Sequence, residues 1–251
     1  MGEVNISADE KVVQQTFEEF WRSQGDLPQM EDVGYDIVEL IEEECAPLYG
    51  LRFLEAGSGT GRISLHLAKQ GADVVLLDTS ATALALSRSF FEKAGMHGSF
   101  VQASAFALPF ADSSFDVVWN TGLIEHFLFD DQVKILSEMV RVLKSGGKLL
   151  TFNPSSAGWL YRLGKCILER TGRWHYGREI PIATLAPHCR MLSIRLVKEW
   201  STAFDIQFYY FGKYGLPIQR FIRRRDRLRR FLSRRFGGYL LVSIIEKRGA
   251  G

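Results

Sequence analysis

The chain has 251 residues, of which 46% are hydrophobic and 24% are charged, and its net charge is +2 at pH 7. This is the composition of an ordinary globular protein, and the length suits one domain with additions or two small domains. No apolar run approaches the ~18 residues of a membrane-spanning helix. The first ten residues also lack the basic segment followed by an apolar one that marks a signal peptide.

The three cysteines, Cys45, Cys166 and Cys189, are odd in number and far apart in the sequence. Their spacing argues against a disulfide framework and provides no metal-binding pair, so we predict no metal site. We expect a cytoplasmic protein.

Charge is distributed unevenly along the chain. Residues 217–236 contain nine arginines and one acid, Asp226, whereas residues 31–44 contain seven acids and no basic residue. This asymmetry is the second informative feature of the chain, after its glycine-rich turn.

Two helices are predicted before the first strand, over residues 8–23 and 34–45. In the first of them Phe17, Phe20 and Trp21 belong to an apolar stripe at helical spacing. Packing in the core is one interpretation of this stripe.

A glycine-rich turn follows, and the rest of the chain is organised around it. The apolar residues 51–54 lead to Glu55, glycines stand at 57, 59 and 61, and a helical pattern begins at Arg62. Glycine allows positive φ and a close approach of backbone to ligand. The dinucleotide fingerprint fails, because its sixth position, counted from Gly57, is Arg62 and not glycine. Two interpretations of the glycine-rich turn remain: it binds a different ligand, or it binds none.

The order Glu-x-Gly-x-Gly-x-Gly resembles the first motif of the class I S-adenosylmethionine (SAM)-dependent methyltransferases. The resemblance implies that the turn lies against the amino-acid end of SAM. The residues expected there are Glu55, Gly57, Ser58, Gly59 and Gly61. It also implies that the N-terminal helices fold over the cofactor, which makes Phe17 and Trp21 candidates for the acceptor pocket.

The next strand, residues 72–78, ends in an acid. Asp78 lies 17 residues beyond Gly61, close to where a doubly wound fold delivers the tip of its second strand. A carboxylate there can accept hydrogen bonds from both ribose hydroxyls. We predict Asp78, with Thr79 beside it, as the ribose contact; an acid facing solvent is the alternative.

A helix is expected over residues 81–94 and a short strand over 99–102. Residues 103–110 then resemble the family's third motif, in which an acid contacts the amino group of adenine. Ser104 occupies the position of that acid, and a hydroxyl can accept the hydrogen bond without a charge. The Ala105 backbone and the Phe106 ring are therefore also expected to contact adenine.

Residues 112–120 are predicted as a strand, with Asp116 as a structural turn residue. The segment 121–127 after it resembles the fourth motif of small-molecule methyltransferases, and it leaves the carboxyl end of a strand, where open α/β sheets bind ligands. The resemblance places Asn120 and Thr121 beside the methionine part of SAM. His126 is the candidate general base; a histidine held for packing is the alternative.

Asp130 or Asp131 is expected to cap a helix that runs to Leu143. Residues 144–147 are read as a turn into the strand 148–153, an order that again resembles the family. Residues 155–200 follow the family less closely, and there His175 and Tyr176 are candidates for the acceptor pocket. A short helix is expected over 182–191.

The last two strands are predicted over residues 202–210 and 238–246, with the arginine-rich stretch between them as one amphipathic helix. Three interpretations of this helix stay open. It packs on the sheet with a solvated basic face, it lies on an anionic membrane surface or serves an acidic or lipid-linked substrate, or it contacts nucleic acid.

The resemblance implies a Rossmann-like, doubly wound α/β fold with seven strands, mostly parallel, and an antiparallel C-terminal hairpin. Residues 1–50 would cover the cofactor, 51–154 would bind SAM, and 155–251 would complete the same domain with the acceptor segment. We predict a SAM-dependent methyltransferase that acts on oxygen or carbon of a small or lipid-like acceptor. It would be cytoplasmic, and peripheral to the membrane if 217–236 contacts lipid.

Two other functions compete with this one. The first is an RNA or protein methyltransferase that docks through 217–236, although Asn120-Thr121-Gly122 differs from the Asn-Pro-Pro-Tyr or Asp-Pro-Pro-Tyr of amino-directed nucleic-acid enzymes. The second is a binding protein of the same fold without catalysis. The complete glycine motif and Asp78 argue against the second, whereas Ser104 favours it.

Overall fold

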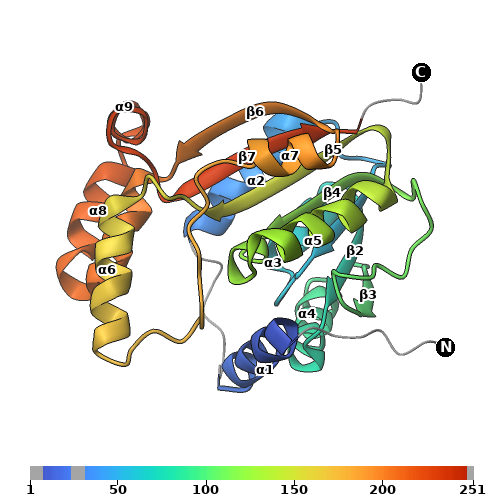
Figure 1. The fold of residues 1–251 in the computed structure, drawn as a ribbon, viewed down its shortest axis with the longest axis horizontal. Helices are drawn as coiled ribbons and strands as arrows, with labels where there is room; N and C mark the ends of the chain where they lie inside the picture. The colour runs from blue at the N-terminus through green and yellow to red at the C-terminus, as the bar shows by residue number, and fades with distance from the viewer. Residues whose placement is uncertain (1–7, 24–31, 248–251) are drawn as a thin grey trace.

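The computed structural model describes residues 8–23 and 32–247. Its centre is a seven-stranded sheet in the order β3-β2-β1-β4-β5-β7-β6 (Figure 1). The strands are β1 (Arg52–Ala56), β2 (Asp73–Asp78), β3 (Ser99–Gln102), β4 (Phe115–Thr121), β5 (Leu143–Pro154), β6 (Arg195–Thr202) and β7 (Leu240–Glu246). The predicted fold is confirmed, including the antiparallel C-terminal strands.

The first five strands run parallel, and β7 pairs antiparallel with both β5 and β6. Strands buried on both faces require apolar residues at nearly every position. The runs 53–54, 74–77 and 117–119 meet this requirement, and all of their side chains are buried. Their carboxyl ends meet at one edge of the sheet, which fixes where a ligand binds.

Helices cover both faces of the sheet. They are α1 (Ala8–Ser23), α2 (Asp32–Cys45), α3 (Arg62–Lys69), α4 (Ala81–Lys93), α5 (Phe129–Val142), α6 (Trp159–Arg170), α7 (Ala186–Met191), α8 (Leu216–Arg223) and α9 (Asp226–Phe236), with the 3-10 segments η1 (Ile124–His126) and η2 (Phe204–Tyr214). One core cluster joins the sheet to α2, α3 and α4. The other joins it to α5 and α7. Within the described ranges, no helix has both the length and the apolar character needed to cross a bilayer.

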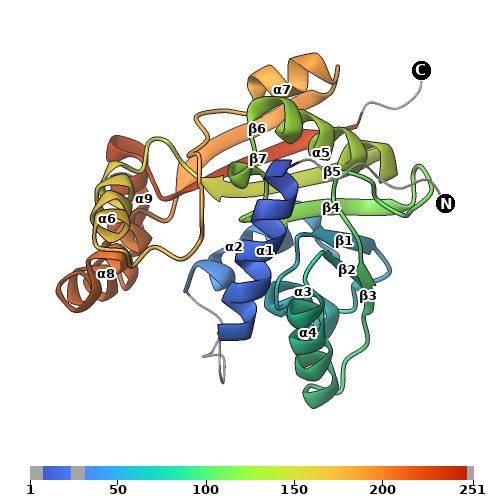
Figure 2. The same ribbon diagram turned by 60° about the horizontal axis from the view of Figure 1, so that its bottom comes forward.

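Two groups of helices lie outside this sandwich (Figures 1 and 2). The helices α6, α8 and α9 gather at one end of the molecule, beyond the end of β5 and the start of β7. The helix α1 also lies outside the sandwich, against the start of α4 and beside the edge where the parallel strands end.

The strand predicted over 202–210 is wrong. The strand is β6, which precedes it, and residues 204–214 form η2. Ala203 takes a left-handed φ of 59°, which ends the extended chain. Asp205 and Gln207 alternate with apolar residues as in a strand, yet both side chains are fully buried and bonded inside the protein. The alternation therefore reflects buried polar contacts, and not a strand with one face exposed to solvent.

The single arginine-rich helix is also wrong, because residues 224–225 separate α8 from α9. Arg223 and Arg229 both pair with Asp36 and Asp205. Six residues in a continuous helix correspond to a rotation of 600°, which would direct these two side chains to different sides. The break lets both of them reach the same acids.

Smaller differences concern the ends of elements. Neither Asp130 nor Asp131 caps α5: the helix starts at Phe129, and Leu128 at the cap position makes no side-chain bond. The predicted helix 182–191 is shorter, because Ile182 bridges to Ser155 and α7 starts at Ala186. Residues 144–147 are counted within β5.

Candidate active site

The glycine turn between β1 and α3 has the backbone that its sequence predicts. Gly57, Gly59 and Gly61 have φ values of 71°, 51° and 60°, in the region that favours glycine. A Cβ on Gly61 would come within 2.0 Å of Leu76 Cδ2, so this glycine lets α3 pack closely on β2. The turn exposes its backbone to the cavity above it.

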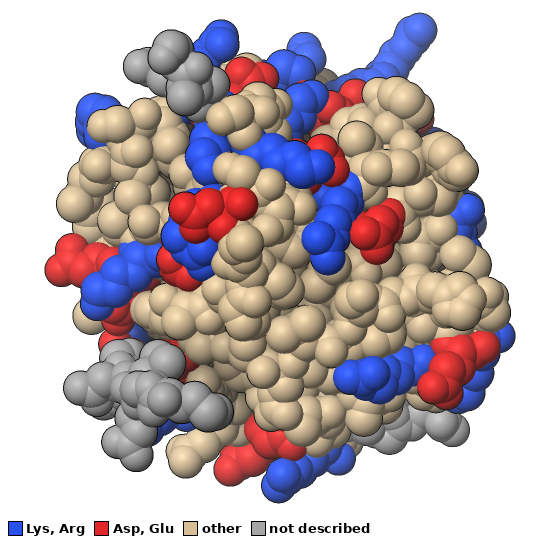
Figure 3. Space-filling model, turned by 90° about the vertical axis from the view of Figure 1, so that its right-hand side faces the viewer, with Lys and Arg blue, Asp and Glu red and all other residues tan. Residues whose placement is uncertain are grey.

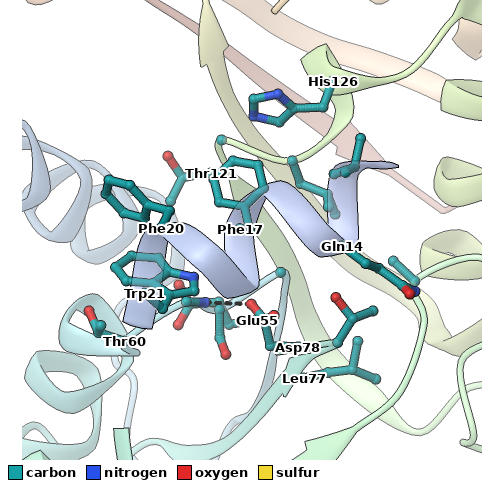
Figure 4. A pocket seen from close by; sticks show the side chains of 18 of the residues that line it. Gln14, Phe17, Phe20, Trp21, Glu55, Thr60, Leu77, Asp78, Thr121 and His126 are labelled. Carbon is teal, nitrogen blue, oxygen red and sulfur yellow. Dashed lines mark hydrogen bonds between the residues drawn. The ribbon is translucent and has the colours of Figure 1, made fainter. Parts of the chain in front are cut away.

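That cavity has a volume of about 610 Å³ and lies at the carboxyl ends of the parallel strands. It is lined by residues from the glycine turn, the end of β2, the loop after β3, the end of β4 and α1 (Figure 4). The predicted cofactor residues that line it are Glu55, Gly57, Ser58, Gly59, Gly61, Asp78, Thr79, Ser104, Ala105, Phe106 and Thr121. The predicted acceptor residues Phe17, Trp21, His175 and Tyr176 line it as well, and so does His126.

Asn120 is the exception among the predicted residues. It does not line the cavity, and its amide Nδ2 lies 3.9 Å from Met139 Sδ on α5. Successive side chains of a strand point to opposite faces. Thr121 therefore faces the cavity, and Asn120 faces α5.

Two carboxyl groups stand at the base of the cavity. Asp78 accepts hydrogen bonds from the Gly59 amide at 2.7 Å and the Ser80 amide at 2.8 Å, which joins the turn to β2 (Figure 4). Glu55 accepts a bond from the Ser64 hydroxyl at 2.6 Å. Burial raises the pKa of both groups, and the charge of Asp78 adds to the rise in the pKa of Glu55. A polar or cationic ligand is the natural partner of two such groups.

Helix α1 covers the turn. A Cβ on Gly59 would come within 2.8 Å of the Trp21 ring, so the ring rests on the bare glycine. Glu18 of α1 accepts bonds at 2.5 Å from the hydroxyls of Ser80 and Thr82, at the start of α4. The indole and this carboxylate hold the helix over the glycine turn and the start of α4.

Glu10 is a cavity residue that the sequence did not reveal. Its carboxylate is 3% exposed and accepts a hydrogen bond from the Ser104 hydroxyl, while that hydroxyl accepts one from the Phe106 amide at 3.0 Å. A carboxyl group thus stands beside Ser104. Glu10 and Ser104 are 94 residues apart, and no local pattern could have joined them.

Part of the cavity lining is aromatic. Phe20, His175, Tyr176 and Tyr209 line the cavity, and the Phe20 and Tyr176 rings lie 5.1 Å apart. Phe17 stacks edge-on against His126 at 4.9 Å. The cavity thus combines carboxyl groups and backbone with flat apolar surfaces, which suit different parts of a ligand.

His126, which also lines the cavity, is fixed in one orientation. Its Nδ1 lies 2.7 Å from the Arg178 carbonyl, which requires a proton on Nδ1 and leaves a lone pair on Nε2. The ring is 4% exposed, and burial lowers its pKa to about 4. A neutral imidazole with so low a pKa is a weak base near pH 7.

Comparisons with known proteins decide the family. A model described as a methyltransferase domain matches residues 54–151. A demethylmenaquinone methyltransferase of Thermus thermophilus is 40% identical over 152 residues, which are 54% of this chain and 68% of that protein. The chain belongs to the class I SAM-dependent methyltransferases. A ubiquinone biosynthesis O-methyltransferase of a Ruegeria species is 36% identical over 41% of this chain and 40% of its own length.

The fold of this methyltransferase is shared more widely than its sequence. The crystal structure of magnesium protoporphyrin IX methyltransferase from Synechocystis PCC 6803 with bound SAH has a TM-score of 0.64 at 15% identity. The match covers 96% of this chain and 100% of that one. At this identity the likeness shows the fold alone.

The residues of the cavity fit SAM, which supplies the methyl group as a sulfonium. The glycine turn lines the cavity with its backbone, and Glu55 and Asp78 add two carboxyl groups at the base. These groups would hold the amino-acid and ribose parts, and α1 would exclude water from above. Alignment of the two reactants alone can supply ~7–11 kcal/mol of a barrier.

Proposed function

We propose that this enzyme methylates a hydroxyl or an acidic carbon of a small phenol-like or quinol-like acceptor. The aromatic lining of the cavity carries the proposal, because Phe20, Tyr176 and Tyr209 offer flat surfaces to an acceptor. Offset and edge-on contacts with aromatic rings favour a flat acceptor. The names of the two quinone-directed relatives support the same class.

Within this proposal the predicted cofactor residues that line the cavity keep their roles, and Glu10 is added to them. The carboxylate of Glu10 would accept the hydrogen bond from the adenine amino group. The Ser104 hydroxyl is an uncharged acceptor and could not replace it fully. His126 remains a candidate for contact with the acceptor.

Calorimetric titration with SAM and with S-adenosylhomocysteine, beside Asp78→Ala, tests the cofactor site first. Binding by the wild type that is strongly weakened in the variant supports it, whereas a folded wild type that binds neither compound contradicts it. A screen of catechols and quinols with labelled SAM then tests the acceptor class. Transfer to proteins or RNA, and none to phenols, would contradict that class.

A second proposal concerns the arginine-rich segment 217–236: that it lies on an anionic membrane surface. The segment exposes large apolar side chains among its arginines, with Phe221 54% and Phe231 60% exposed. Apolar groups beside arginines suit the boundary between headgroups and acyl chains. The opposite end of the molecule instead mixes positive and negative groups around an uncharged centre (Figure 3).

A further inference from the structure

Two glutamates lie behind the cavity wall near His126, and the function above does not use them. Glu125 in η1 is 2% exposed. The amide of Ile180 donates a hydrogen bond of 2.8 Å to the Glu125 carbonyl, which brings Glu179 beside it. Among the described residues, neither Glu125 Oε2 nor Glu179 Oε1 has a hydrogen-bond partner, and both atoms are shielded from solvent. Orphaned carboxyl oxygens are rare in folded proteins and call for an explanation.

The carboxyl group of Glu125 stands next to the cavity wall. Its Oε1 lies 4.0 Å from His126 Nε2, and a Cβ on Gly122 would come within 3.7 Å of the same oxygen. Gly122 and His126 both line the cavity. Among the described contacts, Gly122 and His126 therefore separate the carboxyl group of Glu125 from the cavity.

The surroundings of the pair keep protons on it near neutral pH. Burial raises the pKa of Glu179 to about 8. Burial also raises the pKa of Glu125 well above its usual range, and the charge of Glu179 adds to that rise. The other titratable or charged groups that face this region are His126, Arg178, Lys165, Tyr210 and Tyr239. A base whose pKa lies near the working pH is well matched to proton transfer, whereas His126 is not.

We propose that Glu125 and Glu179 form a carboxyl pair that takes the proton released by the acceptor, while neutral His126 orients the acceptor hydroxyl. The proposal rests on the acceptor class proposed above. In this step the acceptor O–H bond breaks and its proton passes to a carboxylate oxygen of the pair. The hydroxyl oxygen forms the new bond to the methyl carbon as the carbon–sulfur bond breaks, and its electron pair stays on sulfur.

The alternative is a purely structural pair, in which two protonated carboxyl groups fill space between η1 and the segment 178–180. Such a pair would titrate without changing the rate of methyl transfer. The infrared titration therefore establishes first that the pair exchanges a proton, and the pH dependence of kcat then separates the two possibilities.

The first experiment is infrared spectroscopy of the purified protein from pH 6 to pH 10, on the wild type and on Glu179→Gln. We expect the band of a protonated carboxyl group to disappear with a midpoint of about 8 in the wild type, and this change to be missing in the variant. Glu43→Gln, an exposed glutamate of α2, is the matched control. A wild type without this titration, or a variant that keeps it, overturns the proposal.

The second experiment measures methyl transfer from SAM to the catechol that the screen identifies. We expect kcat to rise with pH in the wild type, because only an ionised pair accepts a proton. Glu125→Gln and Glu179→Gln should lower kcat by roughly 10²–10⁴-fold and leave the affinity for S-adenosylhomocysteine unchanged. His126→Asn should raise KM and keep the pH midpoint.

If His126→Asn loses the pH dependence of kcat and Glu179→Gln keeps it, the base is His126 and the proposal is overturned. If no catechol is methylated although SAM binds, the proposed acceptor class fails. The infrared titration still decides whether the pair exchanges a proton. If Glu125→Gln does not fold, Glu179→Gln carries both tests.

Discussion

The carboxyl groups of the cavity differ in what surrounds them, and this difference divides their roles. Asp78 is bonded by two backbone amides, Glu10 faces a hydroxyl, and Glu179 has an oxygen without a partner among the described residues. Hydrogen bonds stabilise a carboxylate, whereas unrelieved burial favours the acid. The first two are thus suited to fixed contacts with a ligand and the last to the exchange of a proton.

Glu10→Gln is expected to weaken the binding of S-adenosylhomocysteine, because a hydrogen bond to a charged acceptor contributes ~1.5–3 kcal/mol. That range corresponds to roughly ten- to hundredfold in Kd, measured by calorimetry. Glu19→Gln, on the exposed side of the same helix, is the control. Ser104→Asp in the Glu10→Gln background should restore affinity, and a Glu10→Gln protein with wild-type affinity would remove Glu10 from the site.

Glu179→Gln is expected to change the pH dependence of stability. The folded pKa of Glu179 is about 8 against a usual value of 4.5, so the folded state holds a proton that the unfolded state loses between these values. Stability of the wild type therefore falls as pH rises through this window. The variant should unfold at a higher temperature than the wild type at pH 9, and the advantage should be smaller at pH 5. Parallel curves for the two proteins would contradict this expectation.

At the scale of elements, a buried ion cluster ties the acidic and the arginine-rich segments together. Arg223 and Arg229 pair with Asp36 of α2 and with Asp205 of η2, which is fully buried. Two arginines of the segment 217–236 are thereby used inside the protein. These buried ion pairs therefore account for part of the charge asymmetry in the sequence.

Asp205→Ala is expected to lower the free energy of unfolding by ~3–5 kcal/mol, because two arginines lose a buried partner. Denaturant titration measures the change. Asp226→Asn, at the exposed start of α9, should cost no more than about 1 kcal/mol. Equal effects in the two variants would mean that the buried cluster contributes little.

The sequence predicted the elements around the cavity well because their signals are local. Glycines with positive φ, apolar runs and strand-end acids each lie within a few residues of one another, as at Gly59 and Asp78. The segment after β5 was predicted less well because its signals are distant. Residues 204–210 alternate between apolar and polar side chains, as a strand does. This pattern is misleading as long as the partners of Asp205, which lie in α8 and α9, are unknown. Glu10 and the pair of Glu125 with Glu179 depend in the same way on contacts that only the folded chain brings together.

At the scale of the whole molecule, the two ends differ in surface character. The end formed by α6, α8 and α9 exposes Trp159, Phe221 and Phe231 near many arginines. The opposite end mixes charges of both signs (Figure 3). A membrane contact at the first end would orient the molecule relative to a lipid surface.

The protein is expected to sediment with vesicles that contain phosphatidylserine and not with neutral ones, since each arginine near an anionic surface contributes about 1 kcal/mol. Phe221→Ser combined with Phe231→Ser should reduce the bound fraction severalfold. Tyr49→Ser, at an exposed site outside this end, should not. Binding of tRNA that weakens steeply with salt, without vesicle binding, would favour the nucleic-acid interpretation of 217–236 instead.

The position of α1 has a consequence for the timing of turnover. The helix is held over the cavity by Trp21 on Gly59, by Glu18 on the start of α4, and by the Asp9–Arg178 ion pair. A spent cofactor beneath it leaves only after these contacts break. Mixing the loaded enzyme rapidly with acceptor should therefore give a burst of one product per active site, followed by a slower steady state. Trp21→Ala should quicken the slow phase and leave the burst in place.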